Sequence, residues 1–298
     1  MAAIGTGLVI GLIACGGSPA GSGPSPALIT DCRIHPGAGS TGQGSVQYSV
    51  ITVDSRLREY RLFEPPNLNK TMEAPLVIAL HGTPMTADDL ANSTHLDAEA
   101  GFAGFLVAYP NGCDGSWEYP QGGPKAAQID FIGKLITQVE SKFRIDKNRI
   151  FLVGVSSGAV MSYRLACDLA GRVAAVAAVA DAMRPDDCSP SRPISILQMH
   201  GTDDCWDGGC PFPELLGAQA VNQRWRTIDG CTGDPTVSQI GITKTSQWRC
   251  KAGVTVRLDA IMGGHHTWFG CQLCNPVPGE PDANSVIWSF FSGLQTTG

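Results

Sequence analysis

Gly154, Ser156 and Gly158 form a Gly-x-Ser-x-Gly pattern whose serine is a candidate nucleophile. Residues 150–153 are a short β-branched and aromatic run, typical of a buried strand, and residues 159–166 carry small and apolar side chains at helical spacing. Between a strand and a helix the pattern predicts a nucleophile elbow, in which glycines avoid a clash between the two elements. The serine hydroxyl would then project above a sheet at the positive end of a helix.

The pattern alone also fits an ordinary glycine-rich turn, so a catalytic serine needs partners elsewhere in the chain. A serine hydroxyl becomes a nucleophile when a base removes its proton, and the base works best when a carboxylate orients it. Asp203 and Asp204 closely follow one predicted strand, and His265 and His266 closely follow another. Because the order serine, acid, histidine is that of a large class of hydrolases, the sequence predicts a serine hydrolase.

Two backbone N–H groups are expected to form an oxyanion hole, which stabilises negative charge that develops on the substrate. One belongs to Ser157, directly after the nucleophile, and the other to Thr83, in the loop after an early predicted strand. His81 in the same loop is interpreted as a buried histidine that bonds nearby backbone.

Strand-like and helix-like segments alternate along the chain from residue 46 onward. This alternation predicts an α/β fold with a mostly parallel sheet and helices on both faces. Active sites in such sheets gather at the carboxyl ends of the strands, where the serine, acid and histidine candidates all lie. The expected strands are 50–53, 60–63, 75–80, 105–109, 150–153, 173–179, 193–199 and 254–261, and the expected helices include 87–96, 127–143 and 283–291.

The first 45 residues are expected to precede the folded domain. Residues 4–14 are apolar and too few to span a membrane as a helix, and Cys15 ends a segment that resembles a bacterial lipobox. We interpret residues 1–15 as an export signal with a lipidated cysteine; because no Lys or Arg precedes the apolar stretch, a plain signal peptide is the alternative. Residues 16–45, rich in Gly, Ser and Pro, are expected to tether a single domain of residues 46–298 flexibly.

Composition narrows the function classes further. The formal net charge is −6 and no basic run is present, which argues against nucleic-acid binding. Besides Cys15 the chain has ten of its 11 cysteines, an even number that in an exported protein predicts a disulfide framework. A zinc site is the alternative for Cys205, Cys210, Cys271 and Cys274.

Five motifs follow one another in a fixed order along the chain. They are Leu80-His81-Gly82, Tyr109-Pro110-Asn111-Gly112, Gly154-Val155-Ser156-Ser157-Gly158, His200-Gly201-Thr202-Asp203-Asp204 and Gly264-His265-His266-Thr267-Trp268. Together they resemble the polyhydroxybutyrate depolymerase and feruloyl esterase family, over residues 46–291. The resemblance implies an α/β-hydrolase fold.

The resemblance also distinguishes between neighbouring candidates. The family pattern His-Gly-Thr-x-Asp implies that Asp204, rather than Asp203, is the acid. The pattern Gly-Gly-Gly-His-Thr-Trp implies that His266 is the base, but His265 stands where the family has a glycine. This departure keeps His265 as the alternative base.

The family resemblance implies disulfide pairs as well. The expected pairs are Cys167–Cys188 and Cys231–Cys250, with Cys32–Cys113 as the remaining pair. A bridge from Cys205, beside the acid, to Cys271 or Cys274, after the base, would hold the two loops in register. Local pairing of Cys205 with Cys210 is the open alternative.

The implied activity is hydrolysis of a carboxylic ester through an acyl-enzyme. Ser156 would attack the carbonyl, His266 would transfer the proton to the leaving alcohol, and Asp204 would orient the imidazole. No metal or organic cofactor is expected. The partners are the ester substrate and, if Cys15 is lipidated, a membrane reached only through that anchor.

The substrate is expected to be a feruloyl or acetyl ester or a hydroxyalkanoate oligomer. Trp117, Trp206 and Trp268 lie next to the predicted site loops and are candidate substrate contacts, with ordinary packing as the alternative. The alternative functions are a serine peptidase and a surface lipoprotein that uses the hydrolase fold only for binding. We expect an exported bacterial protein, either extracellular or at the cell surface.

Overall fold

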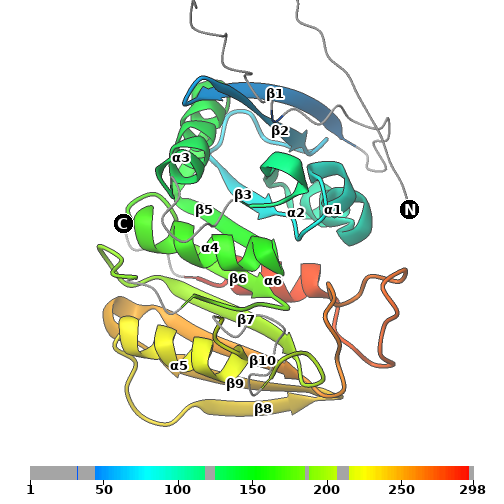
Figure 1. Ribbon diagram of the computed structural model, residues 1–298, viewed down its shortest axis with the longest axis vertical. Coiled ribbons are helices and arrows are strands. Elements are labelled where there is room, and N and C mark those ends of the chain that lie inside the picture. The colour runs from blue at the N-terminus through cyan, green and yellow to red at the C-terminus, as the bar shows by residue number, and fades with distance from the viewer. Residues whose placement is uncertain (1–31, 33–43, 118–124, 185–187, 207–214, 295–298) are drawn as a thin grey trace, which may run out of the picture. The chain divides into compact units, whose positions relative to one another are not determined.

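The computed structural model describes residues 32, 44–117, 125–184, 188–206 and 215–294, apart from the side chains of residues 125 and 126. A ten-stranded sheet with the order β1-β2-β4-β3-β5-β6-β7-β10-β9-β8 runs through these residues (Figure 1). The strands are β1 (Ser45–Val53), β2 (Arg56–Glu64), β3 (Ala74–Leu80), β4 (Leu106–Pro110), β5 (Ile145–Val155), β6 (Ala175–Val179), β7 (Ser195–Gly201), β8 (Thr236–Ile240), β9 (Thr243–Arg249) and β10 (Thr255–Ile261).

The middle of the sheet is parallel and covered on both sides. Strands β4, β3, β5, β6, β7 and β10 pair in parallel from neighbour to neighbour. Every residue of β3 and β6 is buried, as expected for apolar strands between two layers of helices. Antiparallel strands extend the sheet at both ends, β2 and β1 beyond β4, and β9 and β8 beyond β10. The carboxyl ends of the parallel strands therefore share one edge.

Helices cover both faces of the sheet, which confirms the predicted α/β fold. Phe131 of α3 belongs to an apolar cluster with side chains of α4 and α5, and Phe291 of α6 belongs to a second cluster with side chains of α1 and α2. Ile78 and Val77 of β3 enter the first and second cluster respectively, so the clusters lie on opposite faces. The helices are α1 (Ala87–Thr94), α2 (Leu96–Ala103), α3 (Lys125–Lys142), α4 (Ser157–Asp168), α5 (Ala218–Ile228) and α6 (Ala283–Ser292).

Most expected elements are present, and the differences have local causes. The expected helix 87–96 is divided into α1 and α2 because His95 takes a φ of 55°, a left-handed conformation that ends an α-helix. Helix α5 and the hairpin β8–β9 were not predicted. All five residues of β8 are exposed, so this segment lacks the apolar alternation that marks a half-buried strand.

Disulfide bonds connect parts of the domain that are distant in the sequence. The structure contains the three expected pairs, Cys32–Cys113, Cys167–Cys188 and Cys231–Cys250. The first of them spans a sequence separation of 81 residues and ties Cys32 to the turn after β4.

Of the two alternatives left open for Cys205, the structure excludes the bridge to Cys271 or Cys274. Cys271 pairs with Cys274 at a sequence separation of 3. Cys205 is also disulfide-bonded, and Cys210 lies outside the described residues. Because the sulfurs of Cys271 and Cys274 are bonded to each other, the alternative zinc site that would use their thiolates is excluded.

Most of the predicted N-terminal segments lie outside the described residues. These are the signal segment 1–15, with Cys15, and the tether 16–45 except for Cys32, Gly44 and Ser45. Ser45 begins β1, and the N–H of Cys32 donates to Leu57 O at 3.1 Å. Among the helices in the described part of the chain, none is long and apolar enough to cross a membrane.

Candidate active site

Ser156 occupies a sharp turn between β5 and α4. Its φ of 55° and ψ of −122° are values that a non-glycine residue rarely adopts. Glycine is required on either side, because a Cβ on Gly154 would lie 2.3 Å from Gly158 O and one on Gly158 would lie 2.1 Å from Leu80 O. The Ser156 side chain does not cap α4, so the helix does not use its hydroxyl. This geometry is that of a nucleophile elbow.

The loop after β3 packs against the elbow. A Cβ on Gly82 would lie 3.3 Å from Ser156 Cβ, so the main chain passes close to the serine here. The hydroxyl of Thr83 shares hydrogen bonds with those of Ser157, at 2.9 Å, and Ser116, at 3.0 Å. Thr83 and Ser157, the residues expected to supply the oxyanion hole, are therefore in direct contact.

His81 is buried and orients the peptide that carries the Thr83 N–H. Gly112 N–H donates to His81 Nε2 at 2.9 Å, so the ring proton lies on Nδ1 and is donated to Gly82 O, also at 2.9 Å. Burial lowers the pKa of His81 and keeps the ring neutral. Because N–H and C=O point in opposite directions across a trans peptide, the bond to Gly82 O also fixes the direction of the Thr83 N–H.

Asp204 and His266 are in contact. His266 Nδ1 lies 2.9 Å from Asp204 Oδ2, a distance at which a protonated Nδ1 donates to the carboxylate. The side chain of Asp204 is 6% exposed and that of His266 is 55% exposed. A buried carboxylate that orients an accessible imidazole has the geometry of an acid–base pair. Asp203 and His265, the neighbouring alternatives, are exposed.

Backbone contacts hold the acid and base loops together beyond the ends of β7 and β10. Thr202 N–H donates to Ile261 O at 2.9 Å, and Asp203 N–H donates to Gly264 O at 3.0 Å. The Thr202 hydroxyl in turn accepts from Gly263 N–H at 2.8 Å. These hydrogen bonds, rather than a disulfide from Cys205 to Cys271 or Cys274, keep the two loops in register.

A second histidine lies behind the acid, and the sequence analysis did not single it out. His200 is buried, with Nδ1 2.8 Å from Asp181 Oδ1 and Nε2 in contact with the backbone oxygen of Asp204. Its Nε2 also lies 3.4 Å from Asp204 Oδ2. Asp181 follows β6 at the same sheet edge, so the signal that identified Asp204, a carboxylate after a buried strand, was available for Asp181 as well.

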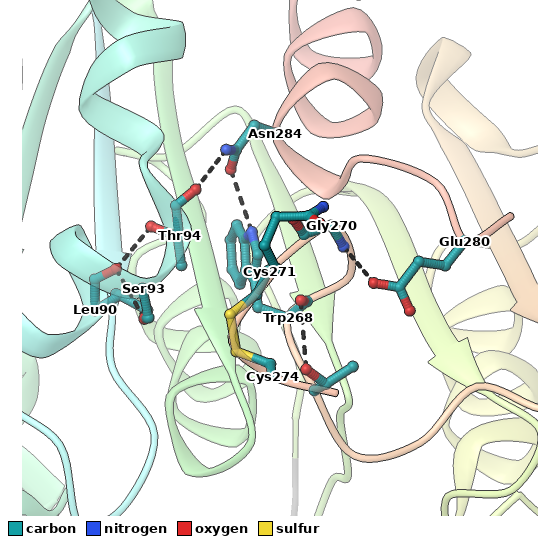
Figure 2. Close-up of a disulfide and its surroundings, with 11 residues drawn as sticks. Leu90, Ser93, Thr94, Trp268, Gly270, Cys271, Cys274, Glu280 and Asn284 are labelled. Carbon is teal, nitrogen blue, oxygen red and sulfur yellow. Dashed lines mark hydrogen bonds between the residues drawn. A yellow bond between two sulfur atoms is a disulfide. The ribbon is translucent and has the colours of Figure 1, made fainter. Parts of the chain in front are cut away.

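The chain beyond the base is anchored to helices on one face of the sheet. Trp268 Nε1–H donates to Asn284 Oδ1 at 3.2 Å, and Asn284 Nδ2–H donates to Thr94 O at 2.6 Å (Figure 2). Next to the disulfide turn, Gly270 N–H donates to the Glu280 carboxylate at 2.7 Å. These contacts connect the base loop to α6 and to the end of α1.

Two of the three tryptophans that were candidate substrate contacts are buried, as the alternative of ordinary packing predicts. Trp117 is 4% exposed, and its Nε1–H donates to His81 O at 2.8 Å. Trp268, at 5% exposed, is equally enclosed. Both rings can be buried because each indole N–H donates to an acceptor inside the protein. Trp206 is half-buried, with its ring 6.1 Å from that of His200, and stays a candidate substrate contact.

Among the described residues, the candidate reactive groups at this edge are the Ser156 hydroxyl, the Asp204–His266 pair and the N–H groups of Thr83 and Ser157. In the described part of the chain, no group of three or more His, Cys, Asp or Glu side chains is arranged to hold a metal ion.

The sheet order, with the elbow after its central strand, places the protein in the α/β-hydrolase fold class. A solved acetyl xylan esterase from Aspergillus awamori has the same fold, with a TM-score of 0.62 and 16% sequence identity. The match covers 84% of this chain and 99% of that chain.

Sequence comparison then gives the family. Residues 58–185 match the family model described as Esterase PHB depolymerase. Feruloyl esterase B of Piromyces equi is 29% identical over 221 residues, which are 68% of this chain and 41% of that protein. A bifunctional acetylxylan esterase/xylanase of Neocallimastix patriciarum is 27% identical over 245 residues, 79% of this chain and 33% of that protein. The chain thus spans less than half the length of these two relatives. The family model and the relatives confirm the resemblance inferred from the five motifs.

Proposed function

We propose that this protein is a serine esterase that hydrolyses carboxylic esters through a covalent acyl-enzyme. The observation that carries the proposal is the 2.9 Å contact between Asp204 Oδ2 and His266 Nδ1. The two loops that form it follow parallel strands at the same sheet edge as the elbow of Ser156. The family match and the names of the curated relatives favour an ester over other acyl substrates.

In the proposed reaction, His266 removes the proton of Ser156 as its oxygen attacks the ester carbonyl. The N–H groups of Thr83 and Ser157 stabilise the charge on the carbonyl oxygen. Asp204 keeps the second proton of the imidazole on Nδ1, so Nε2 can act as the base and then protonate the leaving alcohol. Water repeats the sequence on the acyl-enzyme and releases the carboxylic acid.

We propose a feruloyl or acetyl ester on a plant polysaccharide as the substrate class. Feruloyl and acetylxylan esters are what the names of the two relatives describe. Hydroxyalkanoate oligomers are the second substrate class, because the matching family model is named for polyhydroxybutyrate depolymerase.

We propose further that the protein is exported. Four disulfides among the described residues favour an oxidising compartment. Lipidation at Cys15 would then keep the esterase at the cell surface, which mass spectrometry of the mature N-terminus tests directly.

Purified protein should be assayed with feruloyl, acetyl, p-nitrophenyl and hydroxybutyrate-oligomer esters, next to Ser156→Ala. We expect turnover of at least one ester class and a loss of about 10⁴-fold or more in the variant. A fluorophosphonate probe should label the native chain and leave Ser156→Ala unlabelled. Full activity in the variant would contradict the mechanism. Cleavage of peptides alone would favour a serine peptidase, and absence of both turnover and labelling would favour a binding lipoprotein.

A further inference from the structure

Both ring nitrogens of His200 face hydrogen-bond acceptors. Nδ1 lies 2.8 Å from Asp181 Oδ1, and Nε2 contacts the backbone oxygen of Asp204. A carbonyl oxygen can only accept, so Nε2 must carry a proton. The ring is 1% exposed, so water cannot take the place of either partner.

The hydrogen bonds of Asp181 show whether Nδ1 of His200 carries a proton too. Tyr163 donates its hydroxyl to Asp181 Oδ2 at 2.6 Å, and Gln198 donates an amide N–H to Oδ1 at 3.2 Å. Both carboxylate oxygens of Asp181 are acceptors in these contacts, which leaves the proton of the 2.8 Å contact with Oδ1 to His200 Nδ1. The backbone N–H of Asp181 also lies 3.2 Å from Nδ1, but the contact with the carboxylate is shorter, at 2.8 Å. The proton therefore belongs to Nδ1, and the ring is an imidazolium.

The direction of the pKa shift agrees with this geometry. Burial on its own would lower the pKa of His200. The hydrogen bond and charge of Asp181, together with the charge and backbone oxygen of Asp204, outweigh burial and raise the pKa above its ordinary value. His81, which is equally buried but faces no carboxylate on either nitrogen, shifts in the opposite direction.

We propose that His200 is a positioning residue: a buried imidazolium that is held by Asp181 and clamps Asp204 in the orientation in which its carboxylate meets His266. This inference deepens the proposed esterase function and rests on it. The clamp has two contacts, one to the backbone oxygen of Asp204 and one, at 3.4 Å, to the Oδ2 that also accepts from His266.

A cation behind the acid also changes the electrostatics of the base. The negative charge of Asp204 and the positive charge of His200 act on the His266 imidazole in opposite directions. The charged or titratable groups that face His200 among the described residues are Asp181 after β6 and Asp204 after β7, while Tyr163 of α4 contacts Asp181.

Nuclear magnetic resonance can test the protonation state without any substrate. The chain has six histidines, and His200→Gln identifies the ring signal of His200 by its loss. We expect both ring nitrogens of His200 to remain protonated at about pH 8, above the ordinary pKa of about 6.5. In Asp181→Asn the ring should become neutral at the same pH. A neutral His200 in the native protein at that pH would overturn the proposal.

The kinetic test separates clamping from simple structural support. His200→Gln removes the positive charge behind Asp204, so the acid limb of the kcat/KM–pH profile should move up by about one pH unit. With the clamp lost, kcat should fall by about 10- to 100-fold while KM changes little. If His200 only supported the fold, Asp204 would swing away from His266 and the acid limb would move down instead, which would contradict the proposal.

Two controls keep the outcomes distinguishable. His265→Gln makes the same change at an exposed neighbouring histidine and should leave the acid limb in place. If His200→Gln does not fold, Asp181→Asn removes the counterion of the clamp and is expected to lower kcat in the same way. Failure of the esterase proposal would show as absence of ester turnover by the native chain, whereas failure of this inference would show in the ring signals of His200.

Discussion

Gly201 and Gly264 are in backbone contact where β7 and β10 end, and a Cβ added to Gly201 would lie 2.0 Å from Gly264 O. Gly201 leads to the acid loop and Gly264 leads to the base loop. Because neither backbone can yield without moving its loop, the separation of Asp204 and His266 depends on the absence of a side chain at Gly201.

Gly201→Ala should therefore reduce activity more than a surface glycine change does. The added methyl group forces the two loops apart, and we expect kcat to fall by about 10- to 100-fold and the free energy of unfolding to fall by about 1–3 kcal/mol. Gly171→Ala is the matched control, since a Cβ there would meet nothing within 4 Å. Steady-state kinetics and urea unfolding of both variants check the prediction; equal effects would show that the contact does not position the loops.

Asp204→Asn and Asp203→Asn compare two adjacent carboxylates of opposite burial. Asn at position 204 cannot hold His266 in the tautomer with the proton on Nδ1, so kcat should fall by about 10⁴-fold with the fold retained. Asp203 is exposed and its variant should lose no more than a few-fold. Circular dichroism verifies the fold and ester turnover gives the comparison. Similar losses in both variants would remove the basis for choosing Asp204.

The disulfides should differ in their effect on stability according to the loops they close. Replacing Cys32 and Cys113 by Ser opens a bridge with a sequence separation of 81, and replacing Cys271 and Cys274 opens one with a separation of 3. The chain-entropy relation gives about 4–5 kcal/mol for the first pair and about 2 kcal/mol for the second. Urea unfolding of the two double variants tests the order, and a larger loss for the Cys271–Cys274 pair would contradict it.

Asp229 should make the free energy of unfolding fall as pH rises, which is the opposite of the usual effect of a carboxyl group. Burial raises its pKa to about 7, its Oδ1 accepts from Ile194 N–H at 3.1 Å, and its Oδ2 has no partner among the described residues. Between about pH 4 and pH 7 the folded state therefore retains a proton that the unfolded state releases. The contribution of this carboxyl to the free energy of unfolding then falls as pH rises, by about 4 kcal/mol in total.

Asp229→Asn retains the acceptor for Ile194 and does not titrate. Compared with the native chain, it should gain relative stability from pH 4.5 to pH 7.5, a window of about three pH units around the shift. Urea unfolding at both pH values provides the measurement, and Asp203→Asn, at an exposed position, is the control. A stability difference that stays constant across the window would show that Asp229 titrates normally.

Features that depend on short stretches of sequence were predictable. The buried run of β5 followed by Gly154, Ser156 and Gly158 predicts a tight turn, because glycine tolerates close backbone approach wherever the rest of the fold lies. The parallel sheet followed from alternation of apolar strands and helices. Two of the three long-range disulfides, Cys167–Cys188 and Cys231–Cys250, came from a family resemblance, and Cys32–Cys113 was the pair that remained.

Features that depend on the register between strands were not predictable. His200 and Asp181 meet because β6 and β7 pair with Val179 opposite Met199, and no local pattern encodes that register. For the same reason the sequence left open whether Cys205 bridges to the base loop or pairs locally. The structure excludes that bridge, because the loop after β10 brings Cys271 next to Cys274. Trp268 was expected near substrate from its place in a motif, whereas its burial follows from packing against α6.

The contrast between an enclosed Asp204 and a His266 that is 55% exposed has a consequence for the fate of the acyl group. In the proposed reaction His266 activates the nucleophile that attacks the acyl-enzyme. Because its imidazole is exposed, the surroundings of the base do not exclude nucleophiles other than water. Alcohols in the medium should therefore compete with water. Added methanol or glycerol should divert product from free acid to new ester in proportion to its concentration, so the protein should act as an acyl transferase as well as a hydrolase.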